Sequence, residues 1–188
     1  MKLQHLIAVF CLSLSLIFVF AACGSSEVPE TAEITEENVL GDFSSTDIDG
    51  NPVDKSVFAD AKLTMVNIWG TFCAPCIEEM PDLADINREY ADKGFQIVGL
   101  PMDLLGIDGA LQDYKVEDAR EIIETTGADY LHIMPNAELN AAKLSAVDAV
   151  PETIFVDSEG NQIGESYMGS RSKDSWTAII DGLLEKMK

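Results

Sequence analysis

The sequence predicts an α/β fold in which two neighbouring strands run parallel. Residues 63–69 form an apolar, β-branched run that is typical of a buried strand. The apolar spacing over residues 74–93 is typical of a helix, and Gly94 ends it. Residues 95–102 form a second apolar run, which predicts another buried strand. A strand, a helix and a strand of these lengths make a βαβ unit, so the two strands pair in parallel.

The N-terminus, residues 1–22, has the pattern of a secretory signal and is not expected to join this fold. Lys2 is followed by an apolar run from residue 6 to residue 22, and Ala-Ala-Cys-Gly ends it at residues 21–24. A basic start, a short apolar core and small residues at the exit define such a signal. The alternative is an uncleaved anchor, for which the run is near the lower length limit of a membrane span. Both readings place the rest of the chain outside the cytoplasm and tethered to a membrane.

Cys23 directly follows two alanines, an arrangement that resembles a bacterial lipoprotein signal, in which this cysteine is lipidated. Phe20 departs from that pattern, which usually has Leu at this position. Residues 25–40 then carry five Glu and no Lys or Arg, a composition typical of a solvated spacer. We therefore expect an acidic linker over residues 23–40 after the lipidated cysteine, and one folded domain over residues 41–188.

The remaining elements are predicted from turn residues and local periodicity. Asp49-Gly50 predicts a hairpin turn near the start of the domain. Gly106 and Gly109 make an irregular segment of residues 103–115. The turn residues 158–161 predict a second hairpin. The other expected elements are helices over residues 116–126 and 137–147, strands over residues 130–133, 152–157 and 162–168, and a closing amphipathic helix over residues 174–187.

The charge balance excludes some classes of partner. Twelve Lys and Arg against 33 Asp and Glu give a formal net charge of −21. Nucleic-acid binding needs clustered Lys and Arg to neutralise phosphates, so we expect no nucleic-acid partner. Direct adhesion to anionic lipid head groups is disfavoured for the same reason, so a lipid on Cys23 would have to anchor the chain.

A Cys-x-x-Cys pair, Cys73 and Cys76, lies where the strand over residues 63–69 gives way to the helix over residues 74–93. The first turn of a helix has free N–H groups and the positive end of the helix dipole. A thiolate at Cys73 is stabilised there, so its pKa is expected to fall below that of a free thiol. Cys76, one turn further along, can close a disulfide with Cys73. Pro75 is tolerated because N–H groups of the first turn have no partner within the helix.

Two other readings of the cysteine pair are weaker. A zinc site would need two more ligands, whereas after residue 23 the chain has no third cysteine and one histidine, His132. A purely structural disulfide across two residues closes almost no chain and therefore adds little stability. With Cys11 inside the signal and Cys23 acylated, Cys73 and Cys76 can pair with each other or with a partner protein. We expect redox chemistry and no metal site.

Two separate motifs resemble the thioredoxin superfamily. They are Trp-Gly-Thr-Phe-Cys-Ala-Pro-Cys at residues 69–76 and Val-Pro-Glu-Thr-Ile-Phe-Val-Asp at residues 150–157. The chain is most similar to exported, membrane-tethered thiol–disulfide oxidoreductases of the TlpA/ResA type, and the similarity covers residues 40–188. The resemblance implies a thioredoxin-like fold, in which helices flank a central mixed sheet and a β-hairpin lies near the N-terminus.

The resemblance also implies roles for individual residues. Cys73 matches the attacking cysteine and Cys76 the resolving one. Pro151 matches a cis-proline that lies beside the disulfide. Glu79 matches a buried glutamate of the ResA-like branch, and Asn67 stands where cytoplasmic thioredoxins have a buried aspartate. A carboxyl group in an apolar site has a raised pKa and can exchange a proton near neutral pH. The alternative for Glu79 is a solvated helix charge.

Client contacts are expected at the rim of the disulfide. The resemblance places Phe72, Ala74, Pro75, Val150 and Pro151 there. Phe72 departs from the Trp that is usual before the first cysteine, which alters the rim and therefore the choice of partner.

The expected function is thiol–disulfide exchange with exported, cysteine-containing client proteins, with the chain as the reductant. Reduced Cys73 attacks a client disulfide and Cys76 resolves the mixed disulfide. By analogy with the family, a membrane-embedded thiol carrier recharges the enzyme, and no cofactor beyond the disulfide is needed. The reverse activity, a dithiol oxidase, stays open because the Ala-Pro dipeptide does not fix the reduction potential.

Three further classes fit less well. A copper(I) chaperone of similar fold would use soft thiolates, but that family typically spaces its cysteines by three residues and adds a histidine. A solute-binding lipoprotein leaves the Cys-x-x-Cys pair unexplained. A peroxidase on this fold would need a Pro-x-x-x-Thr-x-x-Cys pattern, which the residues before Cys73 do not form.

Overall fold

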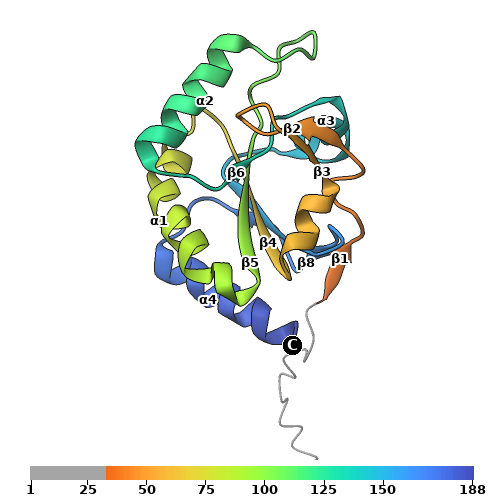
Figure 1. The fold of residues 1–188 in the computed structure, drawn as a ribbon, viewed down its shortest axis with the longest axis vertical. Coiled ribbons are helices and arrows are strands. Elements are labelled where there is room, and N and C mark those ends of the chain that lie inside the picture. The colour runs from red at the N-terminus through yellow and green to blue at the C-terminus, as the bar shows by residue number, and fades with distance from the viewer. Residues whose placement is uncertain (1–32) are drawn as a thin grey trace, which may run out of the picture.

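The computed structural model describes residues 33–188 (Figure 1). The predicted signal over residues 1–22 and the predicted lipidation site Cys23 lie outside the described residues. None of the helices in the described part of the chain is both long and apolar enough to cross a membrane.

A mixed sheet forms the centre of the domain. Its strand order is β1-β8-β7-β4-β5-β6, and β9 pairs with β7. β4 pairs with β5 and β5 with β6 in parallel, whereas β7 is antiparallel to β4. The strands are β1 (Ile34–Glu36), β4 (Leu63–Trp69), β5 (Phe95–Pro101), β6 (Leu131–His132), β7 (Glu152–Asp157), β8 (Gln162–Ile163) and β9 (Tyr167–Met168).

Helices cover both faces of this sheet. α1 (Ala74–Tyr90), α2 (Asp113–Thr126) and α4 (Lys173–Lys186) lie on one face, at the left in Figure 1. The short helix α3 (Ala137–Ala142) and the 3-10 helix η1 (Lys55–Asp60) lie on the other. Successive side chains of a strand point to opposite faces, so the sheet contributes to two cores. Every residue of β4 is buried, as expected for a strand that is covered on both sides.

The predicted N-terminal hairpin is present. β2 (Ser44–Thr46) pairs in antiparallel fashion with β3 (Pro52–Asp54) as a separate two-stranded sheet. The Asp47 carboxylate closes the turn between them, because its Oδ1 accepts the N–H groups of Asp49 and Asn51 at 2.9 and 2.8 Å.

Residues 34–40 differ from the predicted linker and belong to the folded domain. β1 pairs with β8, and Val39 and Leu40 are almost fully buried. The five Glu of residues 25–40 suggested a solvated linker, but Val39 and Leu40 at its end pack into the core. The burial of this apolar surface stabilises the folded segment despite its polar composition.

The bounds of three other elements differ from the sequence prediction. α2 begins at Asp113, inside the segment predicted to be irregular. The predicted helix over residues 137–147 is α3 followed by a 3-10 turn, η3 (Leu144–Ala146). The predicted strand over residues 162–168 is two short strands, because Gly164 between them adopts a positive φ of 71°.

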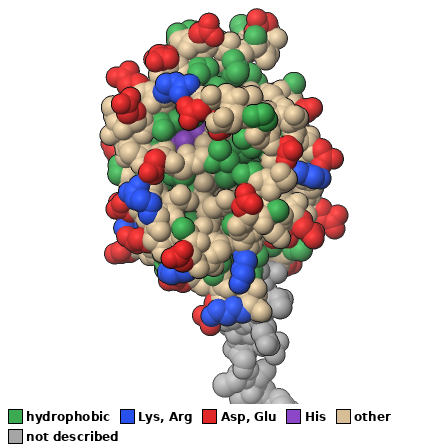
Figure 2. Space-filling model, in the orientation of Figure 1, with side chains coloured by type: hydrophobic (Ala, Val, Ile, Leu, Met, Phe, Trp, Pro, Cys, Tyr) green, Lys and Arg blue, Asp and Glu red, His purple; other side chains and the backbone are tan. Residues whose placement is uncertain are grey.

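Acidic side chains are spread over the face of the molecule in Figure 2, with fewer basic ones between them. Apolar side chains gather near the centre of that face. This distribution agrees with the net charge of −21.

Candidate active site

Cys73 and Cys76 form a disulfide at the carboxyl end of β4, where α1 begins. Cys73 is the N-cap residue of α1, and its Sγ accepts the Cys76 N–H at 3.3 Å. Pro75 occupies the first turn, as predicted. Cys76 is fully buried, whereas 5% of Cys73 is exposed. A partner molecule can therefore approach Cys73, while Cys76 is shielded behind it.

A groove of about 520 Å³ opens beside Cys73. The exposed ring of Phe72 stands at its edge, with 69% of the residue accessible. The Val150–Pro151 peptide bond is cis, as the resemblance implied, and Val150 lines the groove. The structure thus brings the predicted rim residues from two distant segments to one place. The groove is lined by Phe72, Cys73, Ala74, Pro75, Met102 and residues 147–150.

Glu79 is buried in α1, one turn after Cys76, with 4% of the residue exposed. Its Oε1 accepts the Asn67 side-chain amide at 3.2 Å. Its Oε2 accepts the Arg171 backbone N–H at 3.1 Å and the Trp176 indole N–H at 3.3 Å. Burial raises the pKa of the carboxyl group, although these hydrogen bonds act in the opposite direction. Glu79 is therefore a buried, titratable group and not a solvated helix charge, whereas its neighbour Glu78 is exposed.

The partners of Glu79 show what sequence reasoning missed. Trp176 and Arg171 come from the C-terminal part of the chain, 97 and 92 residues away from Glu79. The amphipathic pattern of the closing helix could place Trp176 in the core, but it carries no signal for the carboxyl group that the indole meets.

A row of polar side chains crosses the sheet beside Glu79. Asn67 lies between Thr153 on β7 and Gly99 on β5, and Gly99 lies beside His132 on β6. Asn67 donates to Thr153 Oγ1 at 3.3 Å as well as to Glu79. The His132 ring leans over Gly99, where an added Cβ would come within 2.2 Å of His132 Nδ1. The glycine therefore makes room for the imidazole.

His132 is a core residue, as expected. It stacks on Tyr130 with ring centroids 4.6 Å apart, and its Nε2 donates to the Ala128 carbonyl at 3.0 Å. A carbonyl oxygen only accepts hydrogen bonds, so Nε2 carries a proton. Burial lowers the pKa of His132 to about 4. Within the described residues, no group of three or more His, Cys, Asp or Glu side chains is arranged to hold a metal ion.

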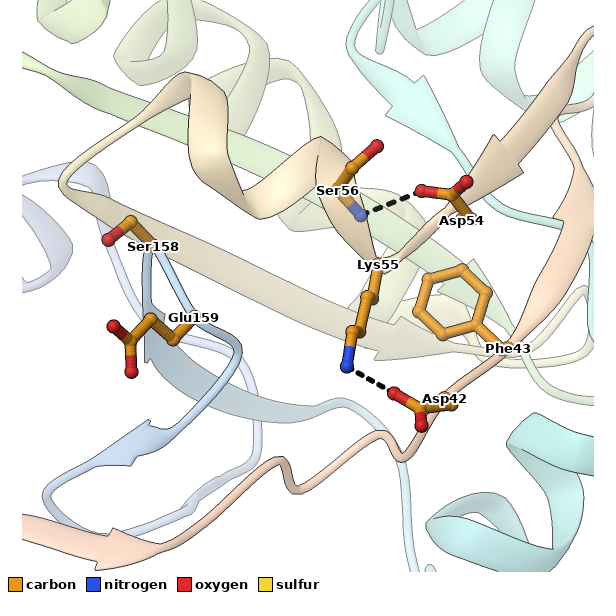
Figure 3. Close-up of a pocket in the computed structure, with 7 residues that line it drawn as sticks. All are labelled: Asp42, Phe43, Asp54, Lys55, Ser56, Ser158 and Glu159. Carbon is orange, nitrogen blue, oxygen red and sulfur yellow. Dashed lines mark hydrogen bonds and ion pairs between the residues drawn. The ribbon is translucent and has the colours of Figure 1, made fainter.

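A larger cavity, of about 620 Å³, lies away from the disulfide (Figure 3). Ser158 and Glu159 line it after the end of β7, which runs antiparallel to β4, so the cavity is at the opposite end of the sheet. Lys55 extends toward Asp42 and pairs with it, and Asp54 caps η1 through the Ser56 N–H at 2.8 Å. These side chains have structural partners and include no thiol or imidazole, so the redox site is the groove at Cys73.

Comparisons with known proteins identify relatives of this chain. A family model described as Redoxin matches residues 34–178. The thiol-disulfide oxidoreductase ResA of Oceanobacillus iheyensis is 29% identical over 142 residues, which cover 74% of this chain and 66% of that protein. The thiol:disulfide interchange protein HelX of Rhodobacter capsulatus is 28% identical over 133 residues, covering 71% and 67%.

Solved structures agree with the fold. The crystal structure of a thiol:disulfide interchange protein from Chlorobium tepidum TLS has a TM-score of 0.63 at 26% identity, and covers 81% of this chain and 98% of that one. With the family match across most of the domain, the mixed sheet and the Cys73–Cys76 disulfide at the start of α1, the chain belongs to the Redoxin family, on the TlpA/ResA-like branch of the thioredoxin superfamily.

Proposed function

We propose that this chain is a thiol–disulfide oxidoreductase that reduces disulfides in exported client proteins. The observation that carries the proposal is the asymmetry of the disulfide: Cys73 reaches a groove, whereas Cys76 is fully buried one turn before a buried carboxyl group. A nucleophile must be reachable, and a resolving thiol must be shielded from the client.

In the proposed reaction, the Cys73 thiolate attacks one sulfur of a client disulfide. The client S–S bond breaks, a mixed disulfide forms, and the second client sulfur leaves as a thiolate. Cys76 then loses its proton, for which Glu79 is the acceptor, and attacks the Cys73 sulfur. The client leaves with two thiols, and the enzyme keeps the Cys73–Cys76 disulfide. Two electrons pass to the client, so a dithiol donor must reduce the enzyme again.

The client is proposed to lie in the groove. Phe72, Ala74 and Pro75 on one side and Val150 and Pro151 on the other would contact it around the sulfur of Cys73, since all but Pro151 line the groove and Pro151 follows Val150 directly. The exposed ring of Phe72 offers an apolar surface where the family usually has an indole.

We also propose that the enzyme works outside the cytoplasm as a lipoprotein. Lys2, the apolar run and Cys23 after Ala-Ala support a cleaved signal over residues 1–22 and a lipid on Cys23. Because the lipid would hold the enzyme at the membrane, the proposed electron donor is a thiol carrier embedded there.

Trapping of mixed disulfides tests the assignment of the two cysteines. Cys76→Ser removes the resolving thiol, so covalent complexes with clients should accumulate and disappear on reduction. Cys73→Ser removes the attacking thiol and should give none, and the double variant serves as the blank. Equal trapping by both single variants, or trapping by neither, would sink the assignment.

The direction of electron flow is tested separately by the equilibrium reduction potential of Cys73–Cys76 in a series of thiol buffers. A reductase of exported proteins should have a potential near or below that of thioredoxin, about −270 mV. A potential near the strongly oxidising end, about −120 mV, would instead identify a dithiol oxidase.

A further inference from the structure

The loop that precedes Cys73 is held by two charged side chains outside the disulfide and its rim. Thr71 lies in this loop, two residues before Cys73. Asp103 directly follows the end of β5 and Met102, and its Oδ1 accepts the Thr71 backbone N–H at 2.9 Å. Its Oδ2 accepts the Thr71 hydroxyl at 2.7 Å. One carboxylate therefore fixes both the backbone and the side chain of Thr71.

Lys115, in the first turns of α2, completes this arrangement. Its Nζ donates to Asp103 Oδ2 at 2.7 Å and to Thr71 Oγ1 at 2.9 Å. The threonine hydroxyl thus donates to Asp103 while it accepts from Lys115. The three side chains form a closed set of hydrogen bonds, called the Thr71 clamp below. The two ends of the irregular segment, Asp103 and Lys115, converge on one residue of the active-site loop.

The clamp is partly buried, which makes its hydrogen bonds stronger than those of a surface ion pair. Only 14% of the Asp103 side chain and 23% of the Lys115 side chain are exposed. Burial acts to raise the pKa of Asp103, but hydrogen bonds from Lys115 and Thr71 outweigh it and lower that pKa. The hydrogen bond to Asp103 raises the pKa of Lys115. Both groups therefore stay charged at neutral pH.

Backbone hydrogen bonds hold the active-site loop on either side of Thr71. The Met102 N–H donates to the Trp69 carbonyl at 2.8 Å, and the Cys73 N–H donates to the Gly70 carbonyl at 3.0 Å. Thr71 lies between these two attachments, and within residues 33–188 its own N–H is bound only by Asp103. If the clamp is lost, the backbone hydrogen bonds at the two ends of the loop remain, but those that hold Thr71 in its middle are lost. The Cys73 sulfur at the start of α1 is then less firmly positioned.

We propose that Asp103 and Lys115 are positioning residues for thiol–disulfide exchange, which hold the loop through Thr71 so that Cys73 stays at the N-terminus of α1. This inference rests on the proposed function, in which Cys73 is the attacking thiol. The thiolate at Cys73 gains its stability from N–H groups and the helix dipole, and that gain falls off steeply with misplacement. Neither Asp103 nor Lys115 needs to touch the client.

The test follows the reactivity of Cys73 in reduced protein across pH, in a Cys76→Ser background with a single titrating thiol in the site. Lys115→Met and Thr71→Val each open the clamp. Each should move the midpoint of the alkylation rate to higher pH, and should lower the rate at neutral pH by about threefold or more, the effect of losing roughly one hydrogen bond to a charged group. Thr71→Ser retains the hydroxyl and should restore the profile.

Arg120→Met is the matched control. Arg120 lies on the same helix and pairs with Asp49 at 2.7 Å, but it is not part of the clamp. It should leave the profile unchanged. The double variant Thr71→Val/Lys115→Met should shift the midpoint by less than the sum of the two single changes, because both remove the Lys115–Thr71 hydrogen bond and act on one coupled set. Circular dichroism confirms that each variant is folded, and Asp103→Asn, which keeps the size of the side chain, replaces any variant that is not.

Midpoints that coincide with the parent for all clamp variants would overturn the inference while leaving the proposed function intact. So would a shift of equal size in Arg120→Met. Failure of the proposed function is a different result: Cys76→Ser then traps no client, whatever the profiles of the clamp variants.

Discussion

Glu79 is a buried carboxyl group that accepts three hydrogen bonds, and no cation within residues 33–188 is in direct contact with its oxygens. Its burial raises its pKa, so the folded state favours the protonated form more than the unfolded chain does. The corresponding part of the stability is fully present below the unfolded pKa and is lost as the pH rises through the folded pKa. In the reduced enzyme we expect this buried acid to titrate together with the thiol of Cys76, one turn before it on α1.

Glu79→Gln is predicted to change the pH dependence of disulfide exchange while the fold survives. An ionised Glu79 repels a thiolate, so its removal should move the midpoint of thiol reactivity to lower pH and should abolish the coupled second step. The alkylation rate of the reduced wild type and variant, followed across pH, measures the effect. Glu78→Gln, a change at the exposed neighbour, should reproduce the wild-type curve.

If the Glu79→Gln and wild-type curves superimpose, Glu79 has no part in the chemistry despite its burial. A collapse of the folded protein in Glu79→Gln would instead show that the carboxylate is needed for packing, and the same measurement in Glu79→Asp would then separate the two effects.

Sequence reasoning succeeded at this scale where a residue type and its spacing carry the chemistry. Cys73 and Cys76 were found from their type and spacing, whereas the cis bond before Pro151 was implied by the resemblance to the thioredoxin superfamily, and the structure contains both the disulfide and the cis bond. It failed for contacts between distant segments. Nothing in the local pattern around Trp176 or Lys115 says which group, 97 or 44 residues away, each side chain will meet.

The packing of His132 between strands depends on the glycine of the neighbouring strand. β4, β5 and β6 bring Asn67, Gly99 and His132 side by side, and the absence of a side chain at Gly99 gives the imidazole its place. The imidazole is neutral and almost fully buried, with a pKa lowered to about 4 against an ordinary value of 6.5.

The buried, neutral imidazole of His132 predicts that the free energy of unfolding decreases in acid. Because the folded pKa of His132 is depressed, the unfolded chain binds the proton first as the pH falls below 6.5. The stabilisation is complete above that pH and is lost progressively down to about pH 4, a change of up to about 3 kcal/mol. His132→Phe keeps an aromatic ring against Tyr130 but cannot titrate, so its free energy of unfolding should fall less over this range.

Urea unfolding of both proteins at several pH values measures the difference. The test uses the slope with pH, so a constant loss of stability from the missing hydrogen bond to Ala128 does not affect it. Parallel curves for wild type and His132→Phe between neutral pH and pH 4 would contradict the assignment.

Elements were predicted well where burial on both faces left a continuous apolar run. The predicted bounds of residues 63–69, 95–102 and 152–157 match β4, β5 and β7 to within one residue. Short elements were predicted less well, since two or three residues give no periodicity: β1 was missed, and β8 and β9 were predicted as one strand. These strands form because neighbouring strands offer hydrogen-bonding partners. The same reason explains why residues 34–40 looked like a spacer.

The whole molecule is acidic, and a lipid on Cys23 is the membrane tether that we propose for it. Its net charge is −21, and no helix among residues 33–188 is able to span a bilayer. Cys23→Ala is therefore predicted to block processing of the signal and to release or misplace the domain. The intact mass of the mature wild-type protein should equal that of the chain starting at Cys23 plus its acyl groups. A mature protein that starts elsewhere and carries no acyl mass would contradict the lipid anchor.

The two ends of β4 have different neighbours. Leu63, at its start, pairs with Asp157, and from there β7 leads to β8 and so to β1, the first strand of the domain. The disulfide follows the other end, after Trp69. Seven residues of strand separate these ends by roughly 20 Å. β1 and the C-terminus are both in the lower half of Figure 1.

If the proposed lipid on Cys23 anchors the chain, the domain is attached to the membrane through its first strand, β1. Its disulfide then lies on the side that faces away from the lipid. Client proteins in the surrounding solution could reach it without obstruction. An electron donor embedded in the bilayer could reach the disulfide only if the domain reoriented and brought the end that carries Cys73 to the membrane surface. Each catalytic cycle would then include a reorientation of the whole domain, and the length of the segment between Cys23 and Ile34 would set how often the enzyme is recharged.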